Sequence, residues 1–67
     1  MMDIYAKPGT QVVFEGEGGY KREVEDAINC GLHIGMAYTV KRTEVHNWMS
    51  YVELEEIEGK FNTVMFS

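Results

Sequence analysis

The chain has 67 residues, with 11 acidic side chains against six basic ones and a formal charge of −5. A chain this short has room for one small domain, so we expect residues 1–67 to fold as a single unit without a deep catalytic cleft. The apolar content of 45% is too high for a disordered chain, and the acidic balance disfavours generic binding to the phosphate backbone of nucleic acids.

The N-terminal part of the chain predicts short extended segments joined by turns. Residues 1–7 form a lead-in that could hold an edge strand around Ile4. A Pro-Gly pair at 8–9 marks a turn, and the β-branched and aromatic stretch 11–15 after it predicts a strand. The next four residues, 16–19, include three glycines and therefore predict a flexible joint.

The spacing of apolar residues changes after the glycine joint. Four of them recur at positions i, i+4, i+7 and i+8, which form one stripe of a helix: Tyr20, Val24, Ala27 and Ile28. Charged residues lie away from this stripe, so we expect a short amphipathic helix of about ten residues. The helix ends near Cys30, because Gly31 suits the left-handed conformation that terminates helices.

The second half of the chain predicts further strands. Apolar and polar side chains alternate over residues 36–44 and again over 52–55, and residues 45–50 connect the two as a hairpin. A turn at 58–60 leads into residues 61–66, which we expect to close the chain with a tight turn and a short final strand.

Together these elements predict a mainly β fold with one short helix. Short strands separated by glycine turns favour a small SH3-like, partly open antiparallel barrel of about five strands. The helix is inserted between the first two main strands and should plug one end of the barrel. No internal repeat, linker or second domain interrupts residues 1–67, so we expect a single SH3-like domain.

Four segments of the chain resemble a known group of proteins. They are QVVFEGEGG at 11–19, LHIGMAYTVK at 32–41, EVHNW at 44–48 and FNTVMF at 61–66. In layout they are similar to the YorP family of small prophage proteins of Gram-positive bacteria. The resemblance implies an SH3-like barrel with one helix between two of its strands, and an origin in a phage or prophage. It implies no activity and no catalytic residues.

The cysteine content bears on the compartment. Cys30 is the only cysteine, so the chain cannot form an intramolecular disulfide, whereas secreted domains of this size usually contain several. We therefore expect a cytoplasmic protein of the bacterial host, with Cys30 buried at the helix end. The first ten residues lack the basic start and apolar run of a signal peptide, and no apolar stretch is long enough to span a membrane.

Patterns that carry catalytic or metal chemistry are weak in this chain. The glycines at 16–19 lack the lysine and hydroxyl of a phosphate-binding loop, and two glutamates, Glu15 and Glu17, accompany them. His33 and His46 are thirteen positions apart and lie in different turns, without the helical spacing of a metal site. We therefore expect no enzyme activity, no catalytic residue, no metal and no cofactor.

The hairpin connection is the most informative stretch for function. It places His46, Asn47, Trp48 and Met49 next to one another, and tryptophan and methionine are enriched where proteins contact each other. Two positions of Trp48 stay open: exposed as the anchor for a partner, or folded back over the barrel mouth as part of the core. If Trp48 is exposed, Tyr51 in the following strand and Tyr20 at the start of the helix could join it in a binding surface.

An acidic face is the second candidate surface. Glu53 and Glu55 share the outer face of their strand, and further acidic residues follow them and lie on the helix. Such a face suits a basic protein partner. We therefore expect a non-enzymatic phage or prophage accessory protein that binds a host or phage protein through the hairpin tip and the acidic face.

Two alternative functions stay open. An SH3-like nucleic-acid-binding module would use a local basic strip around Lys41 and Arg42, although the overall charge disfavours that partner. A small-ligand binder would hold a nucleotide signal between the subunits of a homo-oligomer, because a barrel this small has little interior. We expect no contact with a membrane in either case.

Overall fold

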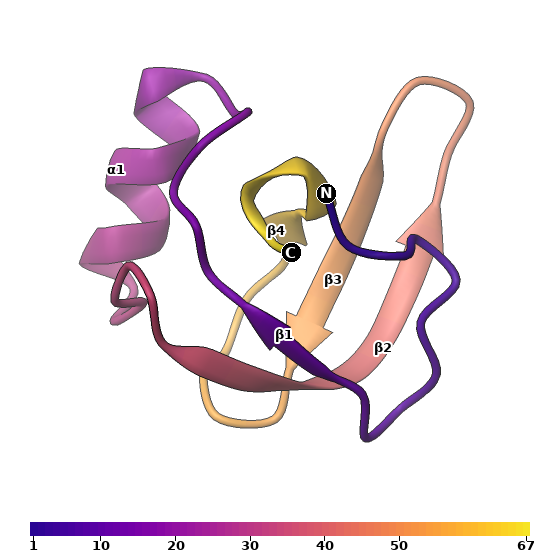
Figure 1. Cartoon of the computed structure of the whole chain (residues 1–67). Coiled ribbons are helices and arrows are strands. Elements are labelled where there is room, and N and C mark those ends of the chain that lie inside the picture. Colours follow the sequence, from indigo (N-terminus) through magenta and orange to yellow (C-terminus); the bar gives the residue numbers. More distant parts are fainter.

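The computed structural model describes all 67 residues and contains four β-strands, one α-helix and one 3-10 helix. In chain order the elements are β1 (Gln11–Val13), α1 (Lys21–Asn29), β2 (Ala37–Val45), β3 (Ser50–Leu54), β4 (Phe61–Asn62) and the 3-10 helix η1 (Thr63–Met65). The strands form one antiparallel sheet in the order β1-β2-β3-β4. The sheet curls around η1, and α1 stands beside it (Figure 1).

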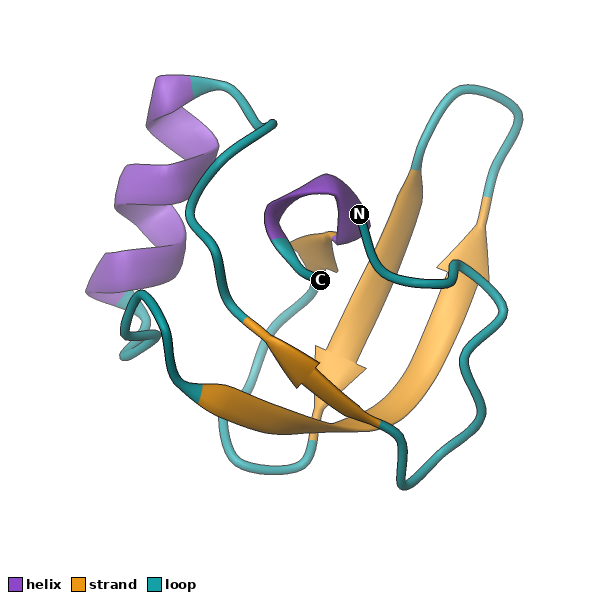
Figure 2. Cartoon of the chain, in the orientation of Figure 1, coloured by secondary structure: helices purple, strands orange, loops and turns teal.

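The long strand β2 belongs to both walls of the curled sheet. Its first residues, Ala37–Thr39, pair with β1, and most of its remainder pairs with β3. The register with β3 shifts between Val40 and Arg42, and a bulge of this kind bends a strand. Because of this bend, β2 pairs with β1 at the bottom of the view in Figure 2 and then continues upward into the hairpin with β3.

The end of the chain closes the curled sheet against β1. Phe14 forms an antiparallel bridge with Phe66, and Val13 and Ser67 exchange both backbone hydrogen bonds at 2.9 Å. The mainly β fold with a partly open SH3-like barrel is therefore confirmed, with the helix inserted between β1 and β2 as expected. Four strands and this bridge make the barrel, where the sequence predicted about five strands.

The two ends of the chain differ from the predicted strands. The segment around Ile4 is a turn, since the Asp3 carboxylate accepts the Tyr5 N–H at 2.9 Å and caps a local bend. At the other end β4 has only two residues before η1 begins. Asn62 causes this change, because its side-chain oxygen accepts the Val64 N–H at 3.1 Å and starts a helical turn.

The core consists of thirteen buried apolar residues from every part of the barrel. Phe14 and Phe66 are fully buried, and their ring centroids lie 5.4 Å apart in a tilted arrangement. Val40 and Val52 bring the two walls of the sheet into the same core. The predicted alternation of β3 is correct, with Val52 and Leu54 inside.

The helix buries less of its predicted stripe than expected. Ala27 is buried and Val24 is half-buried, whereas Tyr20 and Ile28 are exposed. Tyr20 precedes the first helical residue and has an extended backbone, so its side chain leaves the stripe. Cys30 is exposed at the other end, which corrects the expectation of a buried thiol: it follows the last helical residue, outside the packed stripe. No helix of this structure has the length and apolar content needed to cross a membrane.

Candidate functional site

A groove of about 590 Å³ opens at the mouth of the barrel. One side is the glycine joint and the start of α1, and the other is the hairpin between β2 and β3, with the N-terminus and η1 between them (Figure 1). Fourteen residues line it: Met1, Ile4, Gly18, Gly19, Tyr20, Glu23, Val45, His46, Asn47, Trp48, Met49, Ser50, Asn62 and Val64. We call this hollow the mouth groove.

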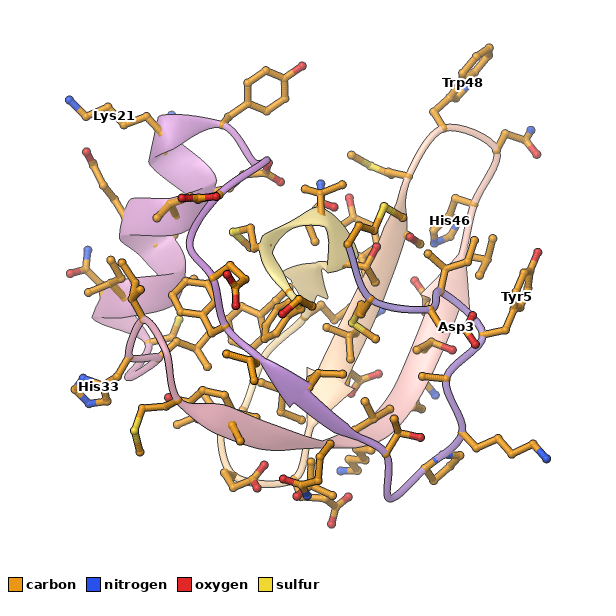
Figure 3. The ribbon with its side chains drawn as sticks, in the orientation of Figure 1. Asp3, Tyr5, Lys21, His33, His46 and Trp48 are labelled. Carbon is orange, nitrogen blue, oxygen red and sulfur yellow. The ribbon has the colours of Figure 1, made fainter.

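Exposed aromatic and apolar side chains form the rim of the mouth groove. Trp48 is 96% exposed at the hairpin tip, where Figure 3 shows its indole directed into solvent. Tyr20 and Met1, on other segments of the rim, are 80% and 72% exposed. The alternative that Trp48 folds back as core is therefore wrong. Apolar surface that stays in contact with water does not contribute to the free energy of folding. Clusters of exposed apolar side chains are typical of surfaces that contact other molecules.

Short-range hydrogen bonds hold the hairpin tip. The His46 N–H donates to the Met49 carbonyl at 2.8 Å and closes the connection between the strands. The Tyr51 hydroxyl donates to the Met49 sulfur at 2.7 Å, and beneath the tip the buried Ser50 and Thr63 hydroxyls hydrogen-bond to each other at 2.5 Å. These contacts fix the base from which the Trp48 indole projects.

A charged network on the outer face steadies the same hairpin. Glu44 accepts hydrogen bonds from the His46 ring at 2.8 Å, from Lys60 at 3.2 Å and from Arg42 at 3.2 Å. The hydrogen bond from His46, followed by that from Lys60, lowers the pKa of the Glu44 carboxyl below its ordinary value of 4.5. The His46 ring also meets the Tyr51 ring edge-on, with centroids 5.9 Å apart. His46 thus ties the groove wall to the outer face.

The structure brings together four of the seven predicted binding residues. His46, Asn47, Trp48 and Met49 all line the mouth groove, whereas Tyr51 lines a second hollow of about 240 Å³ between α1 and the β3–β4 region. Strand geometry explains the separation. Residues at odd positions of β3 point to the outer face, and Ser50 and Val52 point inward.

The predicted acidic face divides into bonded and free carboxylates. Glu53 forms an ion pair with Arg42, which also engages part of the predicted basic strip. The Glu56 carboxylate accepts the Thr39 N–H at 2.8 Å, and this backbone hydrogen bond lowers the pKa of Glu56. Glu55 is exposed and its side chain forms no hydrogen bond or ion pair. Glu53 and Glu56 therefore make contacts within the folded chain, whereas the Glu55 carboxylate makes none.

The glycine joint forms one wall of the groove through close approach to η1. Gly18 has a φ of +83°, and a Cβ built on it would lie 2.8 Å from the Val64 carbonyl oxygen. A Cβ on Gly19 would lie 3.0 Å from the Met65 side chain. The sequence predicts a flexible joint here, and the structure adds that position 18 needs glycine, because its neighbour is a backbone atom, whereas the neighbour of Gly19 is a flexible side chain.

Glu23 is the only Asp, Glu, Lys or Arg among the groove residues. Its carboxylate accepts the Tyr20 backbone N–H at 3.2 Å and the Asn62 amide at 3.4 Å. The first bond is the Glu half of a capping box: it satisfies the N–H of Tyr20, the residue before the first helical residue, and Tyr20 itself contributes no side-chain cap. The sequence counts Glu23 only as part of the acidic face, and it gives no role to the apolar lead-in residues Met1 and Ile4, because only the folded chain places them beside the hairpin.

Metal-binding side chains do not gather anywhere in the structure. No group of three or more His, Cys, Asp or Glu side chains is arranged to hold a metal ion. His33 lies beyond the end of α1 and His46 lies in the hairpin, on opposite sides of the molecule in Figure 3.

Comparison with models of known protein families gives a match over nearly the whole chain. The family model described as Bacteriophage T4 protein Y07B matches residues 3–67, which is nearly the whole chain, so the chain belongs to this family. No curated protein and no solved structure matches significantly. The expectation of a small phage protein is confirmed, and the narrower resemblance to YorP stays a prediction.

Proposed function

We propose that this member of the phage Y07B family is a non-enzymatic accessory protein that binds a host or phage protein in the mouth groove. The observation that carries the proposal is the position of Trp48, whose side chain is 96% exposed on the groove rim. Burying an aromatic side chain of this size against a partner releases about 2–3 kcal/mol of apolar hydration free energy. Trp48 is not buried by any contact within the chain, so this free energy does not contribute to folding.

The side chains of the rim are those that dominate protein interfaces. Tryptophan, tyrosine and methionine are enriched at interface centres, where a few of them supply most of the binding free energy. Trp48, Tyr20 and Met1 come from three distant segments and meet at one concave surface. A concave surface lets a partner side chain be enclosed on several sides, which a flat patch does not allow.

The charge of the molecule supports a partner with basic character. The chain carries a formal charge of −5, and the exposed carboxylates of Asp26, Glu55 and Glu58 form no ion pair. Unpaired surface charges of one sign attract an oppositely charged protein and raise the rate of encounter. In this proposal the acidic face steers the partner and the mouth groove holds it.

The test compares two exposed apolar side chains on different surfaces. A photo-reactive amino acid at position 47, next to Trp48 in the groove lining, identifies the protein cross-linked in phage-infected cells, and the purified pair is then titrated. Trp48→Ala should weaken binding by about 30-fold, as expected for an interface hot spot. Met36→Ala is the control, because Met36 is 54% exposed and lies outside the groove. Unchanged affinity of Trp48→Ala, or an equal loss in both variants, would show that the partner does not use the groove.

A further inference from the structure

We propose that the mouth groove selects a partner segment with a lysine or arginine beside an apolar side chain, and that Glu23 pairs with this cation. This inference rests on the proposed function and specifies the partner chemistry at the same site. Its basis is the combination of one carboxylate with exposed aromatic faces in a groove that no lysine or arginine lines.

The charge of Glu23 has no cationic partner within the molecule. Both groups that donate to its carboxylate are neutral, namely the Tyr20 backbone N–H and the Asn62 amide. Neither Lys nor Arg lies within 4.0 Å of it, although Glu44, Glu53 and Glu25 each have such a partner. The two neutral hydrogen bonds hold the half-buried carboxylate in place while its negative charge remains uncompensated.

The nearest basic residues in sequence do not enter the groove. Lys21 points away from the groove in Figure 3, and its ammonium group lies 4.0 Å from Glu25 on the helix surface. Arg22 is exposed and is not among the groove residues. Met1, with its terminal ammonium, and His46 also line the groove, but neither forms an ion pair with Glu23, so its carboxylate is left without a cationic partner.

The aromatic rim adds a second attraction for the same cation. Lysine and arginine side chains are attracted to the faces of tryptophan and tyrosine, and tryptophan is the strongest of the aromatic partners. Trp48 and Tyr20 present exposed rings on the two sides of the groove that contains Glu23. The long apolar stem of lysine or arginine can also lie along apolar wall residues such as Val45 and Met49.

The experiment uses two blocked pentapeptides that differ only in charge. One is Ac-GLRLG-NH2, and in the other citrulline replaces the arginine, which exchanges the guanidinium for a neutral urea of nearly the same shape. Each peptide is titrated into the intact 15N-labelled chain and followed by NMR. The indole N–H signal is an unambiguous reporter of the rim because the chain has one tryptophan, Trp48.

The arginine peptide should shift the Trp48 indole signal and bind about five- to tenfold more tightly than the citrulline peptide, as a partly exposed ion pair with an added cation–π contact allows. Glu23→Gln should abolish this preference while keeping an oxygen to accept the Tyr20 N–H, so the fold is preserved. Glu25→Gln is the matched control, since Glu25 lies on the exposed face of the same helix outside the groove.

The inference is overturned by equal affinity for both peptides, by a preference that survives Glu23→Gln, or by the absence of any shift of the Trp48 indole with the arginine peptide. An equal loss of preference in Glu25→Gln would also overturn it, because the cause would then be the overall charge. The proposed function fails differently. A partner that depends on Trp48 but is indifferent to Glu23→Gln leaves the groove as the binding site and removes only the cation.

Discussion

Substituting Gly18 by alanine tests whether close approach of the glycine joint to η1 builds the groove wall. Alanine at a φ of +83° has a strained left-handed backbone, which destabilises the folded state. Alanine also lowers the conformational entropy of the unfolded chain, which offsets part of this strain and leaves a net loss of about 1 kcal/mol in unfolding free energy. The new methyl group would also lie 2.8 Å from the Val64 carbonyl oxygen, a backbone atom that cannot rotate away. Relieving this overlap costs about 1–3 kcal/mol more.

Gly9 is the matched control for Gly18. Its φ of +93° imposes similar strain, but a Cβ at that position would meet nothing within 4 Å. We therefore expect Gly9→Ala to lose about 1 kcal/mol of unfolding free energy and Gly18→Ala to lose about 2–4 kcal/mol. The difference between the two variants isolates the cost of the contact with η1.

Urea unfolding followed by far-ultraviolet circular dichroism measures both losses. Tryptophan fluorescence is a poor probe here, because Trp48 is already 96% exposed in the folded chain. The slope of free energy against urea should be unchanged, since the surface exposed on unfolding is the same. Equal losses in Gly9→Ala and Gly18→Ala would refute the reasoning, because the Val64 carbonyl would then impose no constraint.

Two further predictions concern buried and exposed hydrogen bonds. Ser50→Ala should lower the unfolding free energy by about 1–2 kcal/mol in a urea titration, because it leaves the buried Thr63 hydroxyl without its hydrogen-bond partner. The double variant Ser50→Ala with Thr63→Val should recover part of that loss, because it removes both hydroxyl groups. A double variant that is less stable than Ser50→Ala alone would contradict this reasoning. The Glu44 pKa is lowered in the folded state, so the folded chain binds this proton more weakly than the unfolded chain. Its stabilising effect is therefore complete above the ordinary pKa of 4.5 and is lost as pH falls through the lower folded value. Unfolding measured from about pH 6 to pH 3 should show a smaller acid loss in Glu44→Gln than in the parent chain, with the remaining loss partly due to Glu56. Identical pH profiles for the two chains would show that the Glu44 network does not stabilise the fold.

Local patterns in the sequence predicted much of the barrel. The alternation of Val52 and Leu54 with Glu53 is enough to assign β3 and its buried face, because successive side chains of a strand point to opposite sides. The helix was found from its apolar period and its end from Gly31. The ends of the chain were harder, because a two-residue strand and a capped turn carry no period.

The candidate site depends on contacts that no local pattern contains. The sequence drew attention to the stretch His46–Met49 but left Trp48 either exposed or buried. The structure decides this: Trp48 is 96% exposed at the hairpin tip, and the buried side chain next to it in the hairpin is Ser50, paired with Thr63. The sequence assigns Glu23 to the acidic face with the other charged helix residues, whereas the structure places it in the groove opposite the hairpin.

The sequence by itself therefore determined the size, the acidic charge, the mainly β architecture and the hairpin that carries the tryptophan. These features follow from composition and from periods of two and 3.6 residues, which neighbouring residues impose on one another. Only the tertiary structure decided that Met1, the Gly18 loop, Glu23 and the hairpin tip meet around one groove. Such a meeting depends on closure of the barrel between Phe14 and Phe66, which brings together segments some fifty residues apart.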